Sequence, residues 1–156
     1  MRGFTLLCSV ALLAACAKTE TPPADTMAVA PAPEAAPAAA PIALKDVAGT
    51  YAFTGKNEAG DTTLVTYELT ATADTTGWSL VFPKRKPIAQ RVVSVAGDSI
   101  VLEAGPYDSE IYKGVKVTTQ TVYRMQDGKL VGRTVARYDR TGPDTMRIVI
   151  SEGVRK

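Results

Sequence analysis

The residues best placed to do chemistry in this chain are two pairs of carboxylates, since the sequence contains no histidine. Asp98 with Glu103, or Asp108 with Glu110, could act as a general acid and base, and the second pair could also bind Ca²⁺ through oxygen. All four lie in or beside expected turns, where carboxylates are usually exposed, and no nucleophile motif or calcium-loop motif accompanies them. The lack of histidine also removes the commonest general base and metal ligand. We therefore predict that the protein is not an enzyme and uses no metal and no cofactor.

The N-terminal segment has the parts of a secretory signal. Arg2 supplies the positive charge, residues 4–13 form an apolar run, and Ala14 and Ala15 are small. A bilayer core requires about 20 apolar residues, so this run is too short for a retained membrane-spanning helix. The tetrapeptide that ends at Cys16 resembles the lipobox at which bacterial lipoprotein precursors are cleaved and lipidated. The resemblance implies a signal peptide over residues 1–15, a diacylglyceryl thioether on Cys16 and an acylated amino terminus; the alternative is an ordinary cleaved signal in which Cys16 is incidental.

A lipid on Cys16 would hold the protein to a membrane of the bacterial envelope. In many lipoproteins an Asp directly after the cysteine signals retention at the inner membrane, and here that position is Ala17. We therefore expect an outer-membrane lipoprotein that faces the periplasm. Cys8 would leave with the signal and Cys16 would carry lipid, so the folded part would contain no thiol and no disulfide. Export also separates the protein from nucleic acid, which we do not expect as a partner.

Residues 16–44 are expected to be the lipidated cysteine followed by a disordered linker. From Ala17 onward this stretch is rich in Ala and Pro, with too few large apolar side chains to offset the entropy of chain ordering. Repeated proline disfavours a continuous helix and stiffens the chain toward polyproline II. A plain tether is the favoured interpretation, and a spacer through peptidoglycan or a proline-motif ligand is the alternative. The remaining residues, 45–156, are enough for one domain.

The pattern of this domain predicts an all-β fold. Runs rich in Val, Ile, Thr and Tyr alternate with short turns that contain Gly, Asp and Pro, and no segment holds a helical period. The expected strands cover residues 49–54, 62–73, 78–82, 89–95, 99–103, 114–124, 129–138 and 145–151. Tight turns between consecutive strands indicate an antiparallel up-and-down meander, and closure removes its exposed edges. We predict about eight strands that close into a small β-barrel.

Alternation along the strands predicts which side chains face inward. The last strand is expected to bury Met146, Ile148 and Ile150. In the two strands before it, several inward positions are small: Thr119, Thr121, Gly132, Thr134 and Ala136. Such residues would either line a cavity or allow the close approach that a narrow barrel needs. Both interpretations stay open.

Several features of the domain resemble the lipocalin-like, or calycin-like, class of small β-barrels. They are the Gly49-Thr50-Tyr51 opening, the single Trp78, the hairpin from Asp127 to Leu130 and the basic final strand. The resemblance implies that the barrel binds a small apolar molecule.

The charge of the domain is uneven along the chain. Residues 45–112 contain six basic and nine acidic residues, whereas residues 113–156 contain ten basic and four acidic ones. The candidate basic surface consists of Lys84, Arg85, Lys86, Lys116, Arg124, Arg133 and Arg137. It could attract an anionic lipid or an acidic envelope protein, or it could simply be a solvated strand face that resists aggregation. We predict a non-catalytic interaction module on a lipid anchor, with a lipocalin-like carrier or sensor of a small apolar ligand as the alternative.

Overall fold

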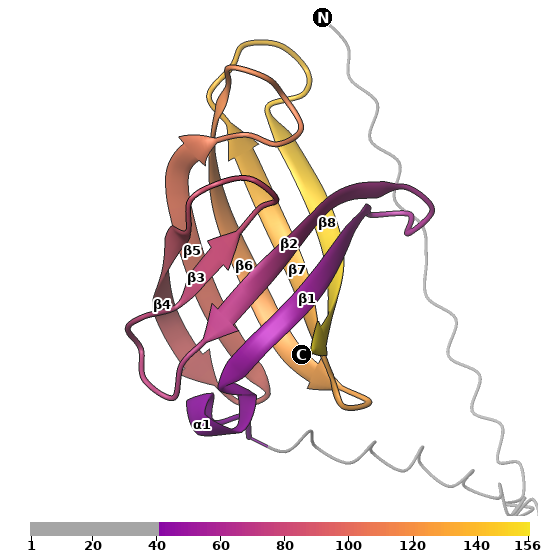
Figure 1. Ribbon diagram of the computed structural model, residues 1–156. Helices are drawn as coiled ribbons and strands as arrows, with labels where there is room; N and C mark the ends of the chain where they lie inside the picture. Colours follow the sequence, from indigo (N-terminus) through magenta and orange to yellow (C-terminus); the bar gives the residue numbers. More distant parts are fainter. Residues whose placement is uncertain (1–40) are drawn as a thin grey trace, which may run out of the picture. The chain divides into compact units, whose positions relative to one another are not determined.

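The computed structural model describes residues 41–156 and shows eight antiparallel strands in sequence order (Figure 1). A short helix, α1 (Leu44–Val47), precedes them. The strands are β1 (Gly49–Asn57), β2 (Thr63–Ala71), β3 (Ser79–Val81), β4 (Ile88–Ala96), β5 (Ser99–Asp108), β6 (Lys116–Gln126), β7 (Lys129–Tyr138) and β8 (Met146–Arg155). Each strand pairs with the next, and β8 pairs with β1, so the sheet closes. The predicted eight-stranded meander and its closure into a barrel are confirmed.

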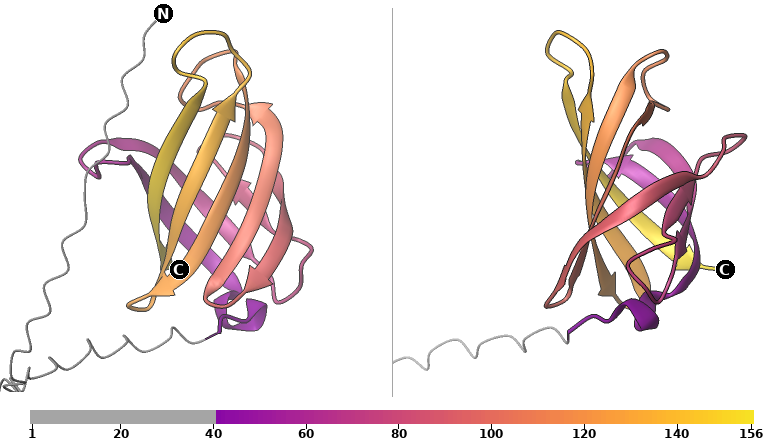
Figure 2. Two further views of the ribbon diagram at one scale, coloured as in Figure 1. Left: turned by 180° about the vertical axis from the view of Figure 1, so that it is seen from behind. Right: turned by 90° about the vertical axis from the view of Figure 1, so that its left-hand side faces the viewer.

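Short turns drive this topology. Asp127 and Gly128 both have positive φ, 50° and 76°, and they join β6 to β7 by a two-residue hairpin. Positive φ at both central residues matches the right-handed twist of the flanking strands. The shortest strand of the wall is β3, which has only three residues. Figure 2 shows that the β5–β6 and β7–β8 connections project from the end of the barrel opposite α1.

The inner faces of β6 and β7 are those expected from alternation, but the inner face of β8 is not. Val149 and Ser151 are buried, whereas Met146 is 54% exposed and Ile148 and Ile150 are only half-buried. The prediction that Met146, Ile148 and Ile150 face the core is therefore wrong. A shift of one residue exchanges the inner and outer faces of a strand. The prediction for β8 selected the more apolar of its two faces, and that face is the outer one. The inward position at Gly153 must be small because the Phe53 ring lies against it.

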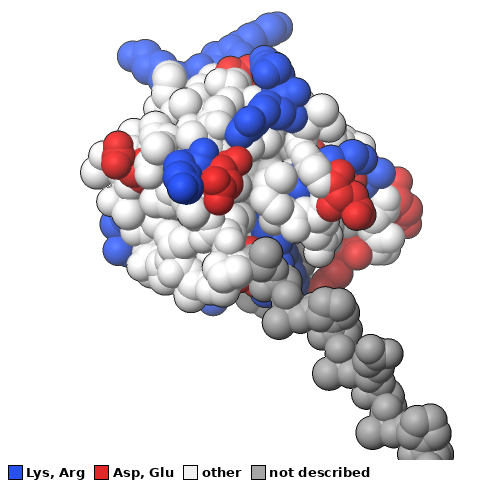
Figure 3. Space-filling view, turned by 90° about the horizontal axis from the view of Figure 1, so that it is seen from below, with Lys and Arg blue, Asp and Glu red and all other residues white. Residues whose placement is uncertain are grey.

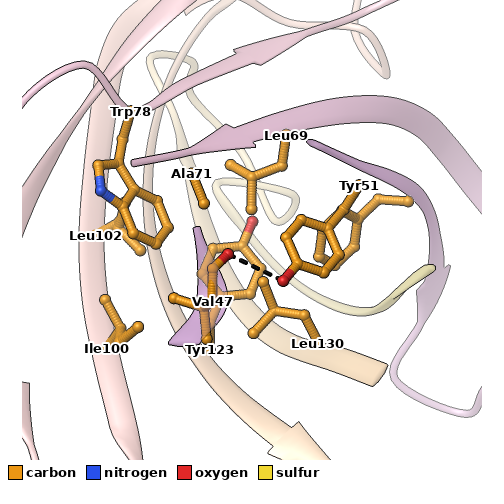
Figure 4. Packing of buried hydrophobic residues seen from close by; sticks show 10 residues of the cluster. Val47, Tyr51, Leu69, Ala71, Trp78, Ile100, Leu102, Tyr123 and Leu130 are labelled. Carbon is orange, nitrogen blue, oxygen red and sulfur yellow. Dashed lines mark hydrogen bonds between the residues drawn. The ribbon is translucent and has the colours of Figure 1, made fainter. Parts of the chain in front are cut away.

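The largest part of the core fills the barrel at the end covered by α1, which we call the closed end (Figure 4). Its fully buried members include Val47 from α1, Tyr51, Leu69, Trp78 and Leu102. The Tyr51 hydroxyl donates to the Val47 carbonyl at 2.9 Å and so fixes α1 across the opening.

The packed part of the chain begins before the expected boundary at Lys45. Ile42 and Leu44 lie against the closed-end core, and the Ile42 amide donates to the Gly97 carbonyl at 2.7 Å. The expected signal peptide, Cys16 and the linker up to residue 40 lie outside the described residues. Within residues 41–156, no helix has the length and apolar character required to cross a membrane.

Candidate functional site

A cavity of about 60 Å³ lies in the half of the barrel away from α1, which we call the open end. Seven of the eight strands, β2 to β8, contribute to its wall. The β5–β6 connection adds Ser109, Glu110 and Ile111 at the rim. Two small apolar clusters flank the cavity in place of the single large core of the closed end, one around Phe82 and one around Tyr138. The barrel is thus filled at one end and hollow at the other.

Aromatic rings make up much of the cavity wall. Tyr67, Phe82, Tyr107, Tyr123 and Tyr138 all line it. The ring of Phe82 lies 5.9 Å from Tyr67 and 6.0 Å from Tyr107, between centroids. Such contacts give a rigid apolar surface, because aromatic rings bury a large area with few rotatable bonds.

A directed chain of hydroxyls separates the cavity from the closed-end core. The Tyr123 and Tyr67 hydroxyls lie 3.1 Å apart, and Tyr67 donates to Ser151 Oγ at 3.1 Å. Ser151 in turn donates to the Gly132 carbonyl at 3.3 Å. Because Tyr67 gives its only proton to Ser151, Tyr123 must be the donor to Tyr67. Burial raises the pKa of both Tyr67 and Tyr123. Both phenols therefore stay neutral at ordinary pH.

The small residues singled out from the sequence fall into two groups. Thr119, Thr121, Thr134 and Ala136 line the cavity, and the Thr121 and Thr134 hydroxyls are hydrogen-bonded at 2.9 Å. Gly132 faces inward but is not among the lining residues. A Cβ at Gly132 would lie 2.6 Å from the Tyr123 ring and 2.7 Å from Ser151 Oγ. Gly132 therefore allows close packing beneath the cavity.

Gln90 is a cavity residue that the sequence analysis missed. It lies on β4, lines the cavity and is only 6% exposed. Its Oε1 is the one buried side-chain oxygen or nitrogen within residues 41–156 that has no hydrogen-bond partner. The available signal was the alternation of β4, in which Ile88, Gln90 and Val92 share one face. A glutamine in the middle of an inward row is unusual, because buried polar groups normally require partners.

Four of the seven residues of the candidate basic surface form ion pairs. Arg85 lies 2.7 Å from Glu110, Lys116 2.8 Å from Asp108, Arg124 3.3 Å from Asp98, and Arg133 3.6 Å from Glu58. The other three, Lys84, Lys86 and Arg137, are exposed and have no ion-pair partner in the described part of the chain. At the closed end, positive and negative side chains are interspersed over a largely uncharged surface (Figure 3). Four of the seven candidate residues are therefore neutralised by a neighbouring carboxylate.

The carboxylate pairs considered for catalysis are tied to different partners. Asp98 accepts from Ser99 and Arg124, whereas Glu103 pairs with Arg91 and accepts from Gln120. The Ser99 hydrogen bond lowers the pKa of Asp98, and the hydrogen bond from Lys116 lowers that of Asp108. Lowered pKa values keep both groups ionised, which does not suit a general acid.

The acidic side chains of residues 41–156 also do not gather into a group of three or more that could hold a metal ion.

The rim of the cavity is held by contacts between connections. The Arg85–Glu110 ion pair links the β3–β4 connection to the β5–β6 connection. Arg147 Nε donates to the Tyr112 hydroxyl at 2.8 Å, and the Arg140 guanidinium lies 4.5 Å from the centroid of the Tyr112 ring. These contacts place the guanidinium groups of Arg140 and Arg147 beside Tyr112 at the open end.

The architecture is that of a small, closed, eight-stranded antiparallel β-barrel, which is compatible with a lipocalin-like fold. The chain matches no protein-family model, no curated protein sequence and no solved structure.

Proposed function

We propose that this protein is a non-catalytic, lipid-anchored envelope protein whose barrel binds a small apolar ligand at its open end. The observation that supports this proposal is the cavity itself, which has an aromatic wall and lies opposite a well-filled closed end. Binding sites for small molecules are typically concave and mostly apolar, with a few polar groups that fix orientation. The carrier function implied by the lipocalin-like resemblance is thus preferred here over the interaction module.

The volume of the cavity limits what can enter. Sites for drug-sized ligands measure about 300–1,000 Å³, several times the 60 Å³ of this cavity. The ligand is therefore either a very small molecule or a larger one that inserts only its apolar end. Glu110 and Ile111 at the rim would contact the part that remains outside.

Native mass spectrometry of the full chain, isolated from its own cells without denaturation, tests this proposal. We expect a bound apolar mass on the wild type that is lost from Ala136→Leu, because Ala136 lines the cavity and Leu would fill it. Ala52→Leu is the matched control, since Ala52 is exposed on the outside of β1. A wild type that carries no mass beyond its covalent lipid would contradict the proposal.

The interaction module remains the second candidate because of the β3–β4 connection. Lys84 and Lys86 are exposed there, close to the open end, and have no ion-pair partner within residues 41–156. Long-range attraction to an anionic lipid or an acidic envelope protein would be weakened by salt. Under this proposal the double charge reversal of Lys84 and Lys86 to Glu reduces binding to vesicles that contain phosphatidylglycerol, while Lys56→Glu on β1 does not. Equal binding by all three proteins would exclude it.

The lipid anchor is proposed from the sequence alone and has a direct test. Cells fed radiolabelled palmitate should label the wild type and Cys8→Ser, but not Cys16→Ser. Label that survives in Cys16→Ser would show that the anchor is elsewhere.

A further inference from the structure

Gln90 lines the cavity, and its buried Oε1 has no hydrogen-bond partner within residues 41–156. An unpaired buried carbonyl loses its hydration without compensation, which is costly, so such groups are rare in folded proteins. The other polar groups around the cavity illustrate the rule. Thr121 pairs with Thr134, and Ser109 Oγ accepts from the amides of Ile111 and Tyr112.

An amide oxygen is only an acceptor, and it therefore selects for a hydrogen-bond donor. A cation would have to leave water for an aromatic pocket, and the acidic side chain at the rim, Glu110, is already paired with Arg85. Neutral O–H or N–H donors avoid this cost. The aromatic wall formed by Tyr67, Phe82 and Tyr107 suits a flat apolar body attached to that donor.

We infer that the ligand is a small neutral apolar molecule that carries one O–H or N–H group, and that Gln90 Oε1 accepts its hydrogen bond inside the cavity. This inference rests on the proposed ligand-binding function and makes it more specific. Gln90 is then the residue that determines specificity, because an analogue without the donor leaves the amide oxygen unpaired. Sites built to pair with a donor discriminate strongly against ligands that lack one.

Phenol and toluene form the matched pair of probes, because a methyl group replaces the hydroxyl on the same ring. A purely apolar cavity favours toluene, since burying a hydroxyl without a partner is unfavourable. The full chain is reconstituted in nanodiscs, and dissociation constants are measured from the methyl NMR resonances of Ala136 and Val149, which both line the cavity. We expect the wild type to bind phenol at least as tightly as toluene.

Gln90→Met removes the amide and keeps a side chain of similar length. We expect phenol affinity to fall about tenfold while toluene affinity is unchanged, which reverses the order of the two probes. Gln120→Met on the exposed face of β6 is the control and should alter neither affinity. Since the substitution removes an unpaired polar group, the melting temperature of Gln90→Met should equal or exceed that of the wild type.

The outcomes separate this inference from the proposed function. If the wild type binds toluene more tightly than phenol, or if Gln90→Met weakens both probes alike, the role of Gln90 is overturned while the cavity remains a binding site. If neither probe binds the wild type, the proposed function fails and the inference fails with it. The comparison of the two probes on the wild type is decisive even if Gln90→Met does not fold.

Discussion

The hydroxyls of Tyr67 and Tyr123 lie 3.1 Å apart inside the barrel, although their strands, β2 and β6, are not neighbours in the sheet. This contact crosses the interior at the level where the closed-end core gives way to the cavity. Phe53 lies on its closed side and stacks on Tyr67 with ring centroids 4.9 Å apart. The hydroxyl chain therefore forms the floor of the candidate site.

The direction of the hydrogen bonds from Tyr123 through Tyr67 to Ser151 predicts that removing the two phenol hydroxyls lowers stability by unequal amounts. Tyr67→Phe leaves the Tyr123 hydroxyl without an acceptor and should lower the free energy of unfolding by about 2 kcal/mol. Tyr123→Phe leaves the Tyr67–Ser151 hydrogen bond intact and should cost about 1 kcal/mol. Urea denaturation of both variants measures the difference. Equal losses of unfolding free energy in the two variants would contradict the assigned direction of these hydrogen bonds.

Alkaline pH should destabilise the barrel through its buried tyrosines. Burial raises the pKa of Tyr138 to about 12, and it also raises those of Tyr67 and Tyr123. In the unfolded chain tyrosine ionises near pH 10. Above that pH the unfolded state binds fewer protons than the folded state, so stability present below pH 10 is lost as the pH rises toward 12.

Tyr138→Phe should reduce this alkaline loss by about 2 kcal/mol at pH 12. The measurement is the free energy of unfolding from urea titrations between pH 7 and 12. Because the sequence has no histidine, we expect little change between pH 6 and 8. A stability that stays level to pH 12 in the wild type would contradict the burial of these phenols.

Gly153 should be intolerant of any side chain. A Cβ at this position would overlap the Phe53 ring, which cannot move without breaking its stack on Tyr67. Gly153→Ala should lower the free energy of unfolding by about 3 kcal/mol. Gly60→Ala is the control, since Gly60 has open space around it and only its φ of 78° is unfavourable for Ala, at about 1 kcal/mol. Thermal denaturation of the two variants should rank them in this order, and the reverse order would exclude close packing as the reason for Gly153.

The closed end should loosen when α1 loses its hydrogen bond to the barrel. Tyr51→Phe removes the bond to the Val47 carbonyl and should cost about 1 kcal/mol. Hydrogen exchange should accelerate at the Ile42 and Asp46 amides, which are bonded to Gly97 and Ala43. Tyr112→Phe removes a phenol at the opposite end and serves as the control. Unchanged exchange at Ile42 in Tyr51→Phe would show that α1 is held by packing alone.

The barrel could be predicted from local chemistry because its strands are joined by short turns. Asp127 and Gly128 illustrate this, since their residue types favour the positive φ values that a two-residue hairpin requires. The inner face of β8 could not be predicted in the same way. Ile148 and Ile150 are more apolar than Ser151 and Gly153, yet the latter face inward, because the space left by Phe53 and Tyr67 decides the fit.

The candidate site was only partly visible in the sequence. Alternation placed small residues such as Thr121 and Ala136 on the inside, but their size was compatible with either a cavity or close packing. Gln90 Oε1 is unpaired because no side chain or backbone group of the neighbouring described strands donates a hydrogen bond to it. The local sequence around Gln90 does not contain this information. The pairing of Arg85 with Glu110 likewise depends on two connections that are distant in sequence.

The most direct test of the account is xenon binding, since xenon enters apolar cavities without requiring any hydrogen bond. Methyl NMR spectra of the protein are recorded under increasing xenon pressure. We predict saturable shifts for Ala136 and Val149, which line the cavity, and none for Leu69 and Leu102 in the closed-end core. The absence of shifts at Ala136 and Val149, or equal shifts at all four residues, would contradict the claim that the open end of the barrel receives an apolar guest.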